Sequence, residues 1–409
     1  MNRRVELPVH DEVTGKRRHV ALWMLALFAF SGTLGMHIFV PALPNAAVDL
    51  KASPAALQLT ISLYLVGLAL GQLIYGPVSD RFGRKPTLIG GLILFTLSGL
   101  AACFAQSVDA LVVARLFQAL GGCAGLVLAR AIVRDTAAAH EATQRLALMN
   151  LMVTLGPGVA PLVGGLLAGL FGWRAIFVAL CVLGAANVLC AWRLLPETGV
   201  KLASGGAGAL MRNYRRLLVS PAFVGYAIGG GCATTSLYAF IACAPFIIVG
   251  QLHRPEREIG ICLALLVSGV WFGSVLTSRL VARFSLKRFL VSVNALSVAA
   301  AFVLLAVVLT GHLSLAALIG AMLVYNVGVG AAAPAALVQA ISIDKHAVGS
   351  ASGLYGFAQM AAGAALTALA GLGHDPALAA ASVLALAGVI AQASFWVAIR
   401  YEGRSLTAT

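Results

Sequence analysis

Long uninterrupted runs of apolar residues are the feature of this sequence that most restricts its fold. A helix that crosses a bilayer needs about 20 mostly apolar residues, whereas a strand of an outer-membrane barrel needs about ten alternating ones. The runs here are long and do not alternate, so they predict an all-α membrane protein. Twelve transmembrane helices are predicted, at residues 20–42, 54–76, 86–107, 109–132, 144–170, 173–195, 221–249, 258–281, 288–310, 312–340, 347–371 and 375–399.

Charged residues are too few to give a chain of this size a soluble exterior. Of 409 residues, 60% are hydrophobic and 10% are charged, whereas soluble domains carry about 25% charged residues. The mean hydropathy is +0.95. This composition argues against a soluble enzyme, a nucleic-acid-binding protein and a disordered chain, and the lipid bilayer is the solvent expected for most of the surface.

Lysine and arginine are distributed unevenly between the two sets of predicted loops. If the N-terminus is inside, the outer loops carry only Lys51, Arg174, Arg254 and Arg257 of the 28 basic residues, and Arg115 falls within a span. Cytoplasmic loops of inner-membrane proteins retain lysine and arginine, so both termini are predicted to be cytoplasmic in a bacterial inner membrane. The formal net charge of +14 is thus a topology signal, and no nucleic-acid partner is expected.

The sequence divides into two similar halves. A single shift of the numbering superposes five residues around the loop after the second predicted helix of each half: Gly67 on Gly269, Gly71 on Gly273, Arg81 on Arg283, Phe82 on Phe284 and Lys85 on Lys287. Such repeats predict two six-helix bundles with the substrate held between them. The bundles are expected at 1–200, including a cytoplasmic tail at 1–19, and at 221–409, with a linker at 201–220. A monomer is expected.

The loop between the second and third predicted helices carries the sharpest motif. Residues 76–85 read GPVSDRFGRK, which resembles the G-x-x-x-D-R-x-G-R-[RK] signature of the major facilitator superfamily. The matching residues are Gly76, Asp80, Arg81, Gly83, Arg84 and Lys85.

Four of these residues have a predicted structural role. Gly76 is expected to permit close helix approach, and Gly83 a tight loop. Asp80 is expected to lie near the start of the predicted helix 347–371, whose N-terminal end is positive, and Arg84 to pair with Asp135. The resemblance to the superfamily implies that this cluster latches the two bundles in the outward-facing state.

Two further motifs lie within predicted helices. Arg115, Gln118 and Gly121 resemble the R-x-x-Q-G pattern of the superfamily, with Ala119 in place of its glycine. The predicted helix 144–170 is similar to the G-P-x-x-G-G motif of drug/proton antiporters, with Ala160 in place of the first glycine; its residues are Gly156, Pro157, Pro161, Gly164 and Gly165. Ordinary helix packing through small residues is the alternative explanation of both motifs.

Several short segments together resemble the Bcr/CflA branch of multidrug and chloramphenicol exporters. They are Pro41-Ala42-Leu43-Pro44, the stretch 72–85, Arg134-Asp135, Gly172-Trp173-Arg174 and Pro196-Glu197-Thr198. This resemblance implies efflux of small amphipathic compounds, such as a phenicol, in exchange for protons.

The chain departs from that branch at the site where the branch carries a membrane carboxylate. The segment before Pro41 begins with His37, where the branch usually has aspartate, and no acid lies deep in any predicted span. Histidine can change charge near neutral pH, so the candidates for proton coupling are His37, Asp80 and Asp135. His37 and Arg115 are expected at similar depths, about 6 and 9 Å below the outer membrane edge.

Polar and aromatic side chains in the middle of predicted spans are the candidates for the substrate cavity. They are His37, Tyr64, Arg115, Asn150, Tyr238, Tyr325, Asn326 and Gln359. A hydrogen bond between helices is the alternative role of each. The 7 cysteines and 8 histidines are scattered without metal-site spacing, so no metal, no cofactor and no enzyme activity are expected.

Two other functions remain open at this point. The chain could export anionic metabolites or drugs with Arg115 as the counter-charge, because a lone cation in a membrane needs a partner. It could also be a membrane sensor or scaffold that keeps the fold without transport.

Overall fold

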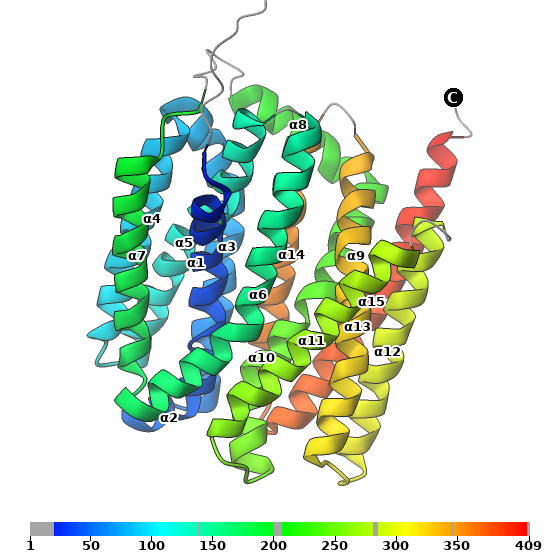
Figure 1. Ribbon diagram of the computed structural model, residues 1–409. Helices are drawn as coiled ribbons and strands as arrows, with labels where there is room; N and C mark the ends of the chain where they lie inside the picture. The colour runs from blue at the N-terminus through cyan, green and yellow to red at the C-terminus, as the bar shows by residue number, and fades with distance from the viewer. Residues whose placement is uncertain (1–19, 138, 200–206, 281–284, 345–346, 407–409) are drawn as a thin grey trace, which may run out of the picture.

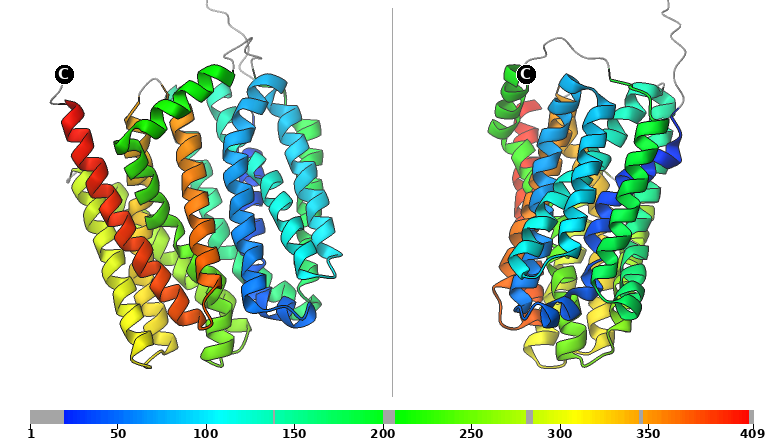
Figure 2. Two further views of the ribbon diagram at one scale, coloured as in Figure 1. Left: turned by 180° about the vertical axis from the view of Figure 1, so that it is seen from behind. Right: turned by 90° about the vertical axis from the view of Figure 1, so that its left-hand side faces the viewer.

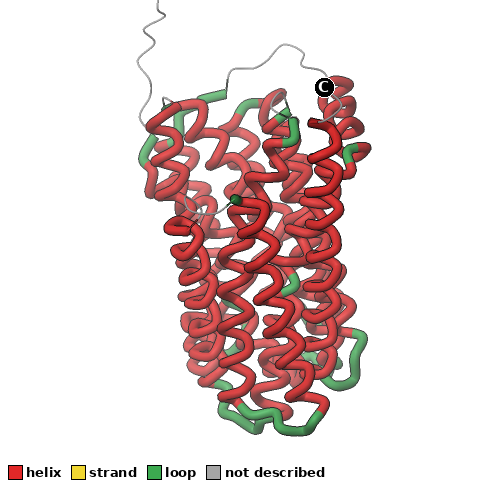
Figure 3. The backbone as a smooth tube through the Cα atoms, turned by 90° about the vertical axis from the view of Figure 1, so that its right-hand side faces the viewer, coloured by secondary structure: helices red, strands yellow, loops and turns green. Residues whose placement is uncertain are grey.

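A computed structural model describes residues 20–137, 139–199, 207–280, 285–344 and 347–406, which form an all-helical bundle (Figure 1). Long helices run between two ends of the molecule, and the loops lie at those ends (Figure 3). Among the described residues, eleven helices are long and apolar enough to cross a membrane. The predicted span at 144–170 lies in a helix of 33 residues, α6, whose described apolar part is Gly156–Phe171.

The first half of the chain holds a group of helices that begins with a broken one. Its elements are α1 (Leu22–His37), the 3₁₀ turn η1 (Val40–Ala42), α2 (Leu43–Asp49), α3 (Pro54–Phe82), α4 (Arg84–Cys103), α5 (Val108–Thr136), α6 (Ala139–Phe171) and α7 (Arg174–Leu194). The second half holds α8 (Ala207–Val219), α9 (Pro221–Thr235), α10 (Leu237–Phe246), the π turn η2 (Ile247–Gln251), α11 (Arg257–Leu280), α12 (Leu286–Leu309), α13 (Leu315–Ser342), α14 (Val348–Gly371) and α15 (Pro376–Leu406).

The two halves pack their helices in the same pattern. In the first half α5 packs against α3 and α4, and in the second half α13 packs against α11 and α12. A Cβ atom on Gly67 would overlap the carbonyl oxygen of Leu116, and one on Gly269 would approach that of Leu323. The glycines that the numbering shift superposes therefore make the same close contact in each half, as a structural repeat requires.

Three elements differ from the predicted boundaries. The first span was predicted to end at residue 42, but α2 continues the chain to Asp49. The predicted span 221–249 is interrupted at Ser236, between α9 and α10, and ends in a π turn. The predicted linker 201–220 contains α8, whose sequence has apolar residues on one face and arginines on the other, so it forms an amphipathic helix rather than plain loop.

The two ends of the bundle differ. At the end that carries α2, here called the α2 end, the halves are packed together: α6 contacts α11, α3 contacts α14, and the side-chain amide of Gln58 donates to the Cys243 sulfur at 3.6 Å. At the other end, the α8 end, α8 lies across the bundle (Figures 1 and 2). A cavity of about 940 Å³ lies there between residues of both halves.

Candidate functional site

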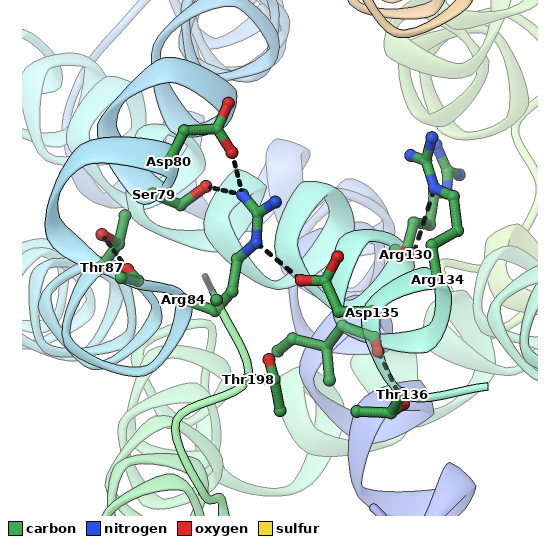
Figure 4. Close-up of polar contacts among 12 residues, drawn as sticks. Ser79, Asp80, Arg84, Thr87, Arg130, Arg134, Asp135, Thr136 and Thr198 are labelled. Carbon is green, nitrogen blue, oxygen red and sulfur yellow. Dashed lines mark hydrogen bonds and ion pairs between the residues drawn. The ribbon is translucent and has the colours of Figure 1, made fainter. Parts of the chain in front are cut away.

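Arg84 is the centre of a charged cluster at the α8 end. Its Nη1 donates to Asp80 Oδ1 at 2.6 Å and to Ser79 Oγ at 2.5 Å, and its Nε donates to Asp135 Oδ2 at 3.0 Å (Figure 4). Asp80 belongs to α3, Arg84 begins α4 and Asp135 is near the end of α5, so one guanidinium joins three helices. We call Asp80, Arg84 and Asp135 the Arg84 cluster. Charge-assisted bonds of this kind fix geometry more than stability where water has access.

The turn before Arg84 depends on Gly83, whose φ of +100° is a conformation that favours glycine. The carboxylate of Glu197, which follows α7, accepts the backbone N–H groups of Arg84 at 2.8 Å and Lys85 at 3.2 Å. A carboxylate at the positive N-terminal end of α4 is favourable, and it ties the α7 end to this loop. Glu197 belongs to the segment Pro196-Glu197-Thr198, for which the sequence predicted no individual role; its position directly after a predicted span was the available signal.

Gly76 does not have the role that was expected of it. A Cβ atom on Gly76 would meet nothing within 4 Å, so no close helix approach occurs there. The guanidinium of Arg81 lies over the ring of Phe82 at 5.4 Å, and Lys85 Nζ donates to the Trp192 carbonyl at 2.8 Å. Asp80 and the first turn of α14 line the same cavity, and among the described residues no hydrogen bond joins them.

The large cavity has a lining of charged, polar and apolar side chains. Its charged residues are the Arg84 cluster together with Arg81, Arg130 and Arg134. Further lining residues are Gln72, Gly76, Pro77, Val78, Phe82, Val127, Ala131, Leu210, Asn213, Tyr214, Gly349, Ser350, Ser352 and Gly353. These come from α3 and α5 of the first half and from α8 and α14 of the second, so the cavity lies at the junction of the halves.

Arg115 lies inside the first half and lines neither this large cavity nor the small cavity beside His37. It is fully buried, and its Nη1 donates to the Gly35 carbonyl at 2.7 Å and to Gln118 Oε1 at 2.8 Å. Its guanidinium carbon lies 4.1 Å from the centre of the Tyr64 ring, and Tyr64 Oη donates to the Gly32 carbonyl at 2.8 Å. These contacts join α1, α3 and α5.

Two more rings complete the pocket around this cation. Phe39 and Phe177 lie 5.6 and 5.9 Å from the Arg115 guanidinium carbon. The face of an aromatic ring attracts a cation, and the attraction is stronger where water is excluded. Nε and Nη2 of Arg115 find no hydrogen-bond acceptor among the described residues.

His37 lies at the junction of the halves. Its Nδ1–H donates to the Thr33 carbonyl at 2.8 Å, which leaves Nε2 as an acceptor, and its ring centre is 6.0 Å from that of Tyr238 in α10. Together with Pro157, Pro161 and other residues it lines a small cavity of about 10 Å³, which is at the lower limit for one water molecule. Asn326 lines the same cavity and donates to the Leu266 carbonyl at 3.0 Å.

The remaining predicted cavity residues make hydrogen bonds between helices. The hydroxyl groups of Tyr325 and Ser236 share a hydrogen bond of 2.5 Å, and Gln359 Nε2 donates to Thr234 Oγ1 at 2.7 Å. None of the seven predicted residues whose side chains are described is exposed on the outer surface. Asn150 lies in α6, and its side chain is outside the described residues.

The glycines of the two helical motifs lie at helix contacts. A Cβ atom on Gly164 would overlap the Ile38 carbonyl, and one on Gly121 would approach the Gly91 carbonyl. Gly156 faces the Phe30 ring, whereas the site above Gly165 is nearly open. The motif in α6 therefore brings this helix onto α1, and α11 approaches its Pro161 from the second half. No group of His, Cys, Asp or Glu suited to a metal ion occurs among the described residues.

Residues 24–368 match the Major Facilitator Superfamily, and the chain therefore belongs to this family of membrane transporters, which are not enzymes. The uncharacterized MFS-type transporter YdgK of Bacillus subtilis is 30% identical over 94% of this chain and 96% of its own length. Multidrug resistance protein D of Escherichia coli is 32% identical over 64% of this chain and 66% of its own length. A crystal structure of a D-xylose-proton symporter superposes with a TM-score of 0.75 at 16% identity, covering 90% of this chain and 96% of the symporter, which shows the shared fold.

Proposed function

We propose that this protein is a secondary active exporter of small amphipathic drugs, which exchanges drug for protons by alternating access. The observation that carries the proposal is the difference between the two ends of the bundle: about 940 Å³ of cavity at the α8 end, and packed helices at the α2 end. A carrier that holds substrate between two bundles needs a state of this form. The likeness to a multidrug resistance protein supports the substrate class.

The proposal places the α8 end on the cytoplasmic side of a bacterial inner membrane. The distribution of lysine and arginine supports this orientation, because the basic segments, among them Arg212, Arg215 and Arg216 of α8, gather at that end. In this orientation both termini are cytoplasmic, α6 is the fifth of twelve spans, and the state described is inward-facing. A single chain encloses the cavity, so the working unit is a monomer.

Alternating access requires that the cavity close at the α8 end while the α2 end opens. The Arg84 cluster stands at the rim that must move, and Asp80 and the first turn of α14 face the same cavity from opposite halves. In the outward-facing state Asp80 would approach the positive N-terminal end of α14. A change in the charge of this cluster would shift the balance between the two states.

Proton coupling has few candidates in this chain. Among the described residues the cavity at the α8 end contains two acids, Asp80 and Asp135, and both are bonded to Arg84. His37 is the titratable group at the closed junction, where it meets Tyr238 across the halves. We propose His37 as the coupling residue and the two acids of the cluster as the second choice.

The test is uptake of a labelled phenicol into inverted vesicles, in which export appears as accumulation inside the vesicle, while the pH gradient is stepped. His37→Gln keeps a hydrogen-bonding side chain but cannot change charge, so efflux should lose its dependence on the gradient. His312→Gln, an exposed position at the α2 end, is the matched control. If efflux by His37→Gln still depends on the gradient, His37 is not the coupling residue and coupling is assigned to the acids of the Arg84 cluster. Wild-type efflux that ignores the gradient would contradict antiport itself.

The two other functions considered receive less support. Arg115 is fully buried among aromatic rings, so in this state it offers no surface to an anionic substrate. A sensor or scaffold has no need for a cavity of this size at the junction of two packed halves.

A further inference from the structure

Two arginines in the cavity at the α8 end have no acidic partner in the part of the chain that the structure describes. Arg130 and Arg134 occupy successive turns of α5, and both line this cavity; in the view of Figure 4 their side chains lie on the opposite side of Asp135 from Arg84. Among the described residues neither forms a salt bridge; Arg134 Nε donates to the Arg130 carbonyl at 3.5 Å. Like charges four residues apart on a helix repel each other, so an arrangement that holds them together is unfavourable unless an anion joins them.

The neighbouring acids cannot neutralise this pair. Asp80 and Asp135 both accept hydrogen bonds from Arg84, which fixes them on the other side of the rim. Apart from Arg81, which adds a further positive charge, the remaining polar groups on the lining are neutral, such as Tyr214 of α8 and Ser350 of α14. The cavity therefore keeps an excess of positive charge, and Arg130 and Arg134 contribute to it.

Depth in the cavity adds a second observation. Because α5 runs from the α2 end to the α8 end, Arg130 lies about 6 Å deeper than Arg134 along the helix. Arg134 is exposed and Arg130 is half-buried. Apolar side chains adjoin the pair on the lining, with Val127 one turn deeper and Ala131 beside it. A ligand that satisfies this surface has a charged head near the rim and an apolar body inside.

We propose that Arg130 and Arg134 bind the oxyanion head, carboxylate or phosphate, of an amphipathic ligand that enters the cavity from the α8 end. This proposal rests on the proposed export function and extends its substrate class to amphipathic compounds with an anionic head. Arginine suits the role because its planar fork can bind two oxygens of one carboxylate or phosphate. The counter-charge for an anionic substrate is therefore this pair rather than Arg115.

The test is a binding measurement on the purified full-length chain in nanodiscs of neutral phosphatidylcholine, with no gradient. Three water-soluble probes share one apolar body: 4-phenylbutyrate, 4-phenylbutanol and 4-phenylbutylamine. The carboxylate should bind at least about tenfold more tightly than the other two, since a bond to a charged group contributes about 1.5–3 kcal/mol. Equal affinity for all three probes would overturn the proposal.

Variants locate the site. Arg130→Gln and Arg134→Gln should each weaken 4-phenylbutyrate binding by about tenfold, and Arg130→Lys should weaken it less because the charge remains. Arg212→Gln removes the same charge from α8 outside the cavity lining and should leave binding unchanged. An equal loss in Arg212→Gln would mean that only the general positive charge of this end matters. Arg134 is exposed, so its variant keeps the test decisive if Arg130→Gln fails to fold.

Repeating the measurement in nanodiscs that contain phosphatidylglycerol separates the two sources of such a head group. Competition by this lipid that is lost in Arg134→Gln identifies a membrane phospholipid as the natural occupant. The absence of competition, with 4-phenylbutyrate still bound, identifies a free amphipathic anion. The proposed export function fails separately, if the chain binds the carboxylate but moves no compound across a membrane.

Discussion

The two halves of this protein share a packing pattern but use charge differently at the α8 end. In the first half Arg84 joins α3, α4 and α5 at the rim of the cavity. In the second half Lys287 of α12 pairs with Glu402 of α15 at 2.9 Å, and Tyr226 of α9 donates to the same carboxylate at 2.8 Å. Neither Lys287 nor Glu402 lines the cavity. The Arg84 cluster thus faces the cavity at the junction, whereas the Lys287–Glu402 pair lies away from it.

The interiors of the halves differ as well. Gly67 packs against Ala119 and Gly269 against Asn326, so these two residues of α5 and α13 are equivalent. Four residues earlier the first half has Arg115 and the second has Met322, and both are buried. A fold can therefore hold a cation at this position only if the surrounding helices provide carbonyls and rings for it, as α1 and α3 do for Arg115.

At the α2 end the two halves use different side chains for the contact between their first and last spans. In the first half Asp49 accepts from Arg174 Nη1 at 2.5 Å and from Trp173 Nε1 at 3.1 Å. At the corresponding place in the second half Gln251 Nε2 donates to Asp375 Oδ1 at 2.7 Å. The acid has moved from the end of one helix to the start of the other, while the contact between the two segments is kept.

The largest effect is expected when the interior of the second half is given the charge of the first. Met322→Arg would bury a cation without partners, at a cost of about 3 kcal/mol or more, and should abolish the yield of folded protein. The measurement is the monodisperse fraction in size-exclusion chromatography. Arg115→Met should lose less, because it leaves two acceptors unsatisfied but no charge. A normal yield of Met322→Arg would show that the halves tolerate charge equally.

A smaller loss is expected where the halves are alike. Gly67→Val and Gly269→Val should each lower the free energy of unfolding by about 2 kcal/mol, because the new side chain meets a backbone carbonyl of the adjacent helix. Thermal unfolding in a neutral detergent is the measurement. Gly76→Val is the control and should unfold like the wild type, since open space surrounds that glycine. A destabilised Gly76→Val would contradict the open site.

The next effect concerns transport rather than folding. Arg84→Asp would set three acids together at the rim, so the balance between the two states should change and the efflux rate should fall by about tenfold, which corresponds to about 1.4 kcal/mol. Drug efflux in vesicles at matched protein content is the measurement. Arg288→Asp reverses an exposed charge in the first turn of α12, directly after the repeated loop of the second half, and should keep most activity. Equal losses in both variants would remove the distinction between the loops.

The smallest effect is expected at the α2 end. Burial raises the pKa of Asp375, but hydrogen bonds from the backbone of Leu378, from Gln251 and from the backbone of Ala377 outweigh it and hold its pKa below the usual range. A carboxylate with a depressed pKa stabilises the fold at pH values above its unfolded pKa of about 4. This contribution disappears as the pH falls through the folded pKa.

Asp375→Asn should accordingly lower stability by about 0.5 kcal/mol at neutral pH, a difference that shrinks below about pH 4. Thermal unfolding of the variant and the wild type across this pH range checks the expectation. Asp109→Asn, at an exposed carboxylate of the same end, is the control. A difference that grows as the pH falls would contradict the role given to the Asp375 carboxylate.

Local features of the sequence were sufficient for the helices and for part of the site. The length of each apolar run is a property of neighbouring residues, so the spans follow from it, and φ at Gly83 follows from a glycine in a short turn. Asp80, Arg84 and Asp135 could be grouped because a short loop and one helix end place them at the same face. The amphipathic helix α8 was missed because its apolar residues are too few to register as a span.

Contacts between distant segments were decided only by the tertiary structure. The sequence placed His37 and Arg115 at similar depths, but only the packed helices decide their partners, with His37 against Tyr238 at the junction and Arg115 inside one half. The open space at Gly76 and the cavity beside Arg130 and Arg134 depend on how the two halves pack against each other. The packing of the halves depends on many weak contacts between distant segments, so no local pattern of residues encodes it. Weak contacts also suit a carrier, because its two halves must be able to change their arrangement.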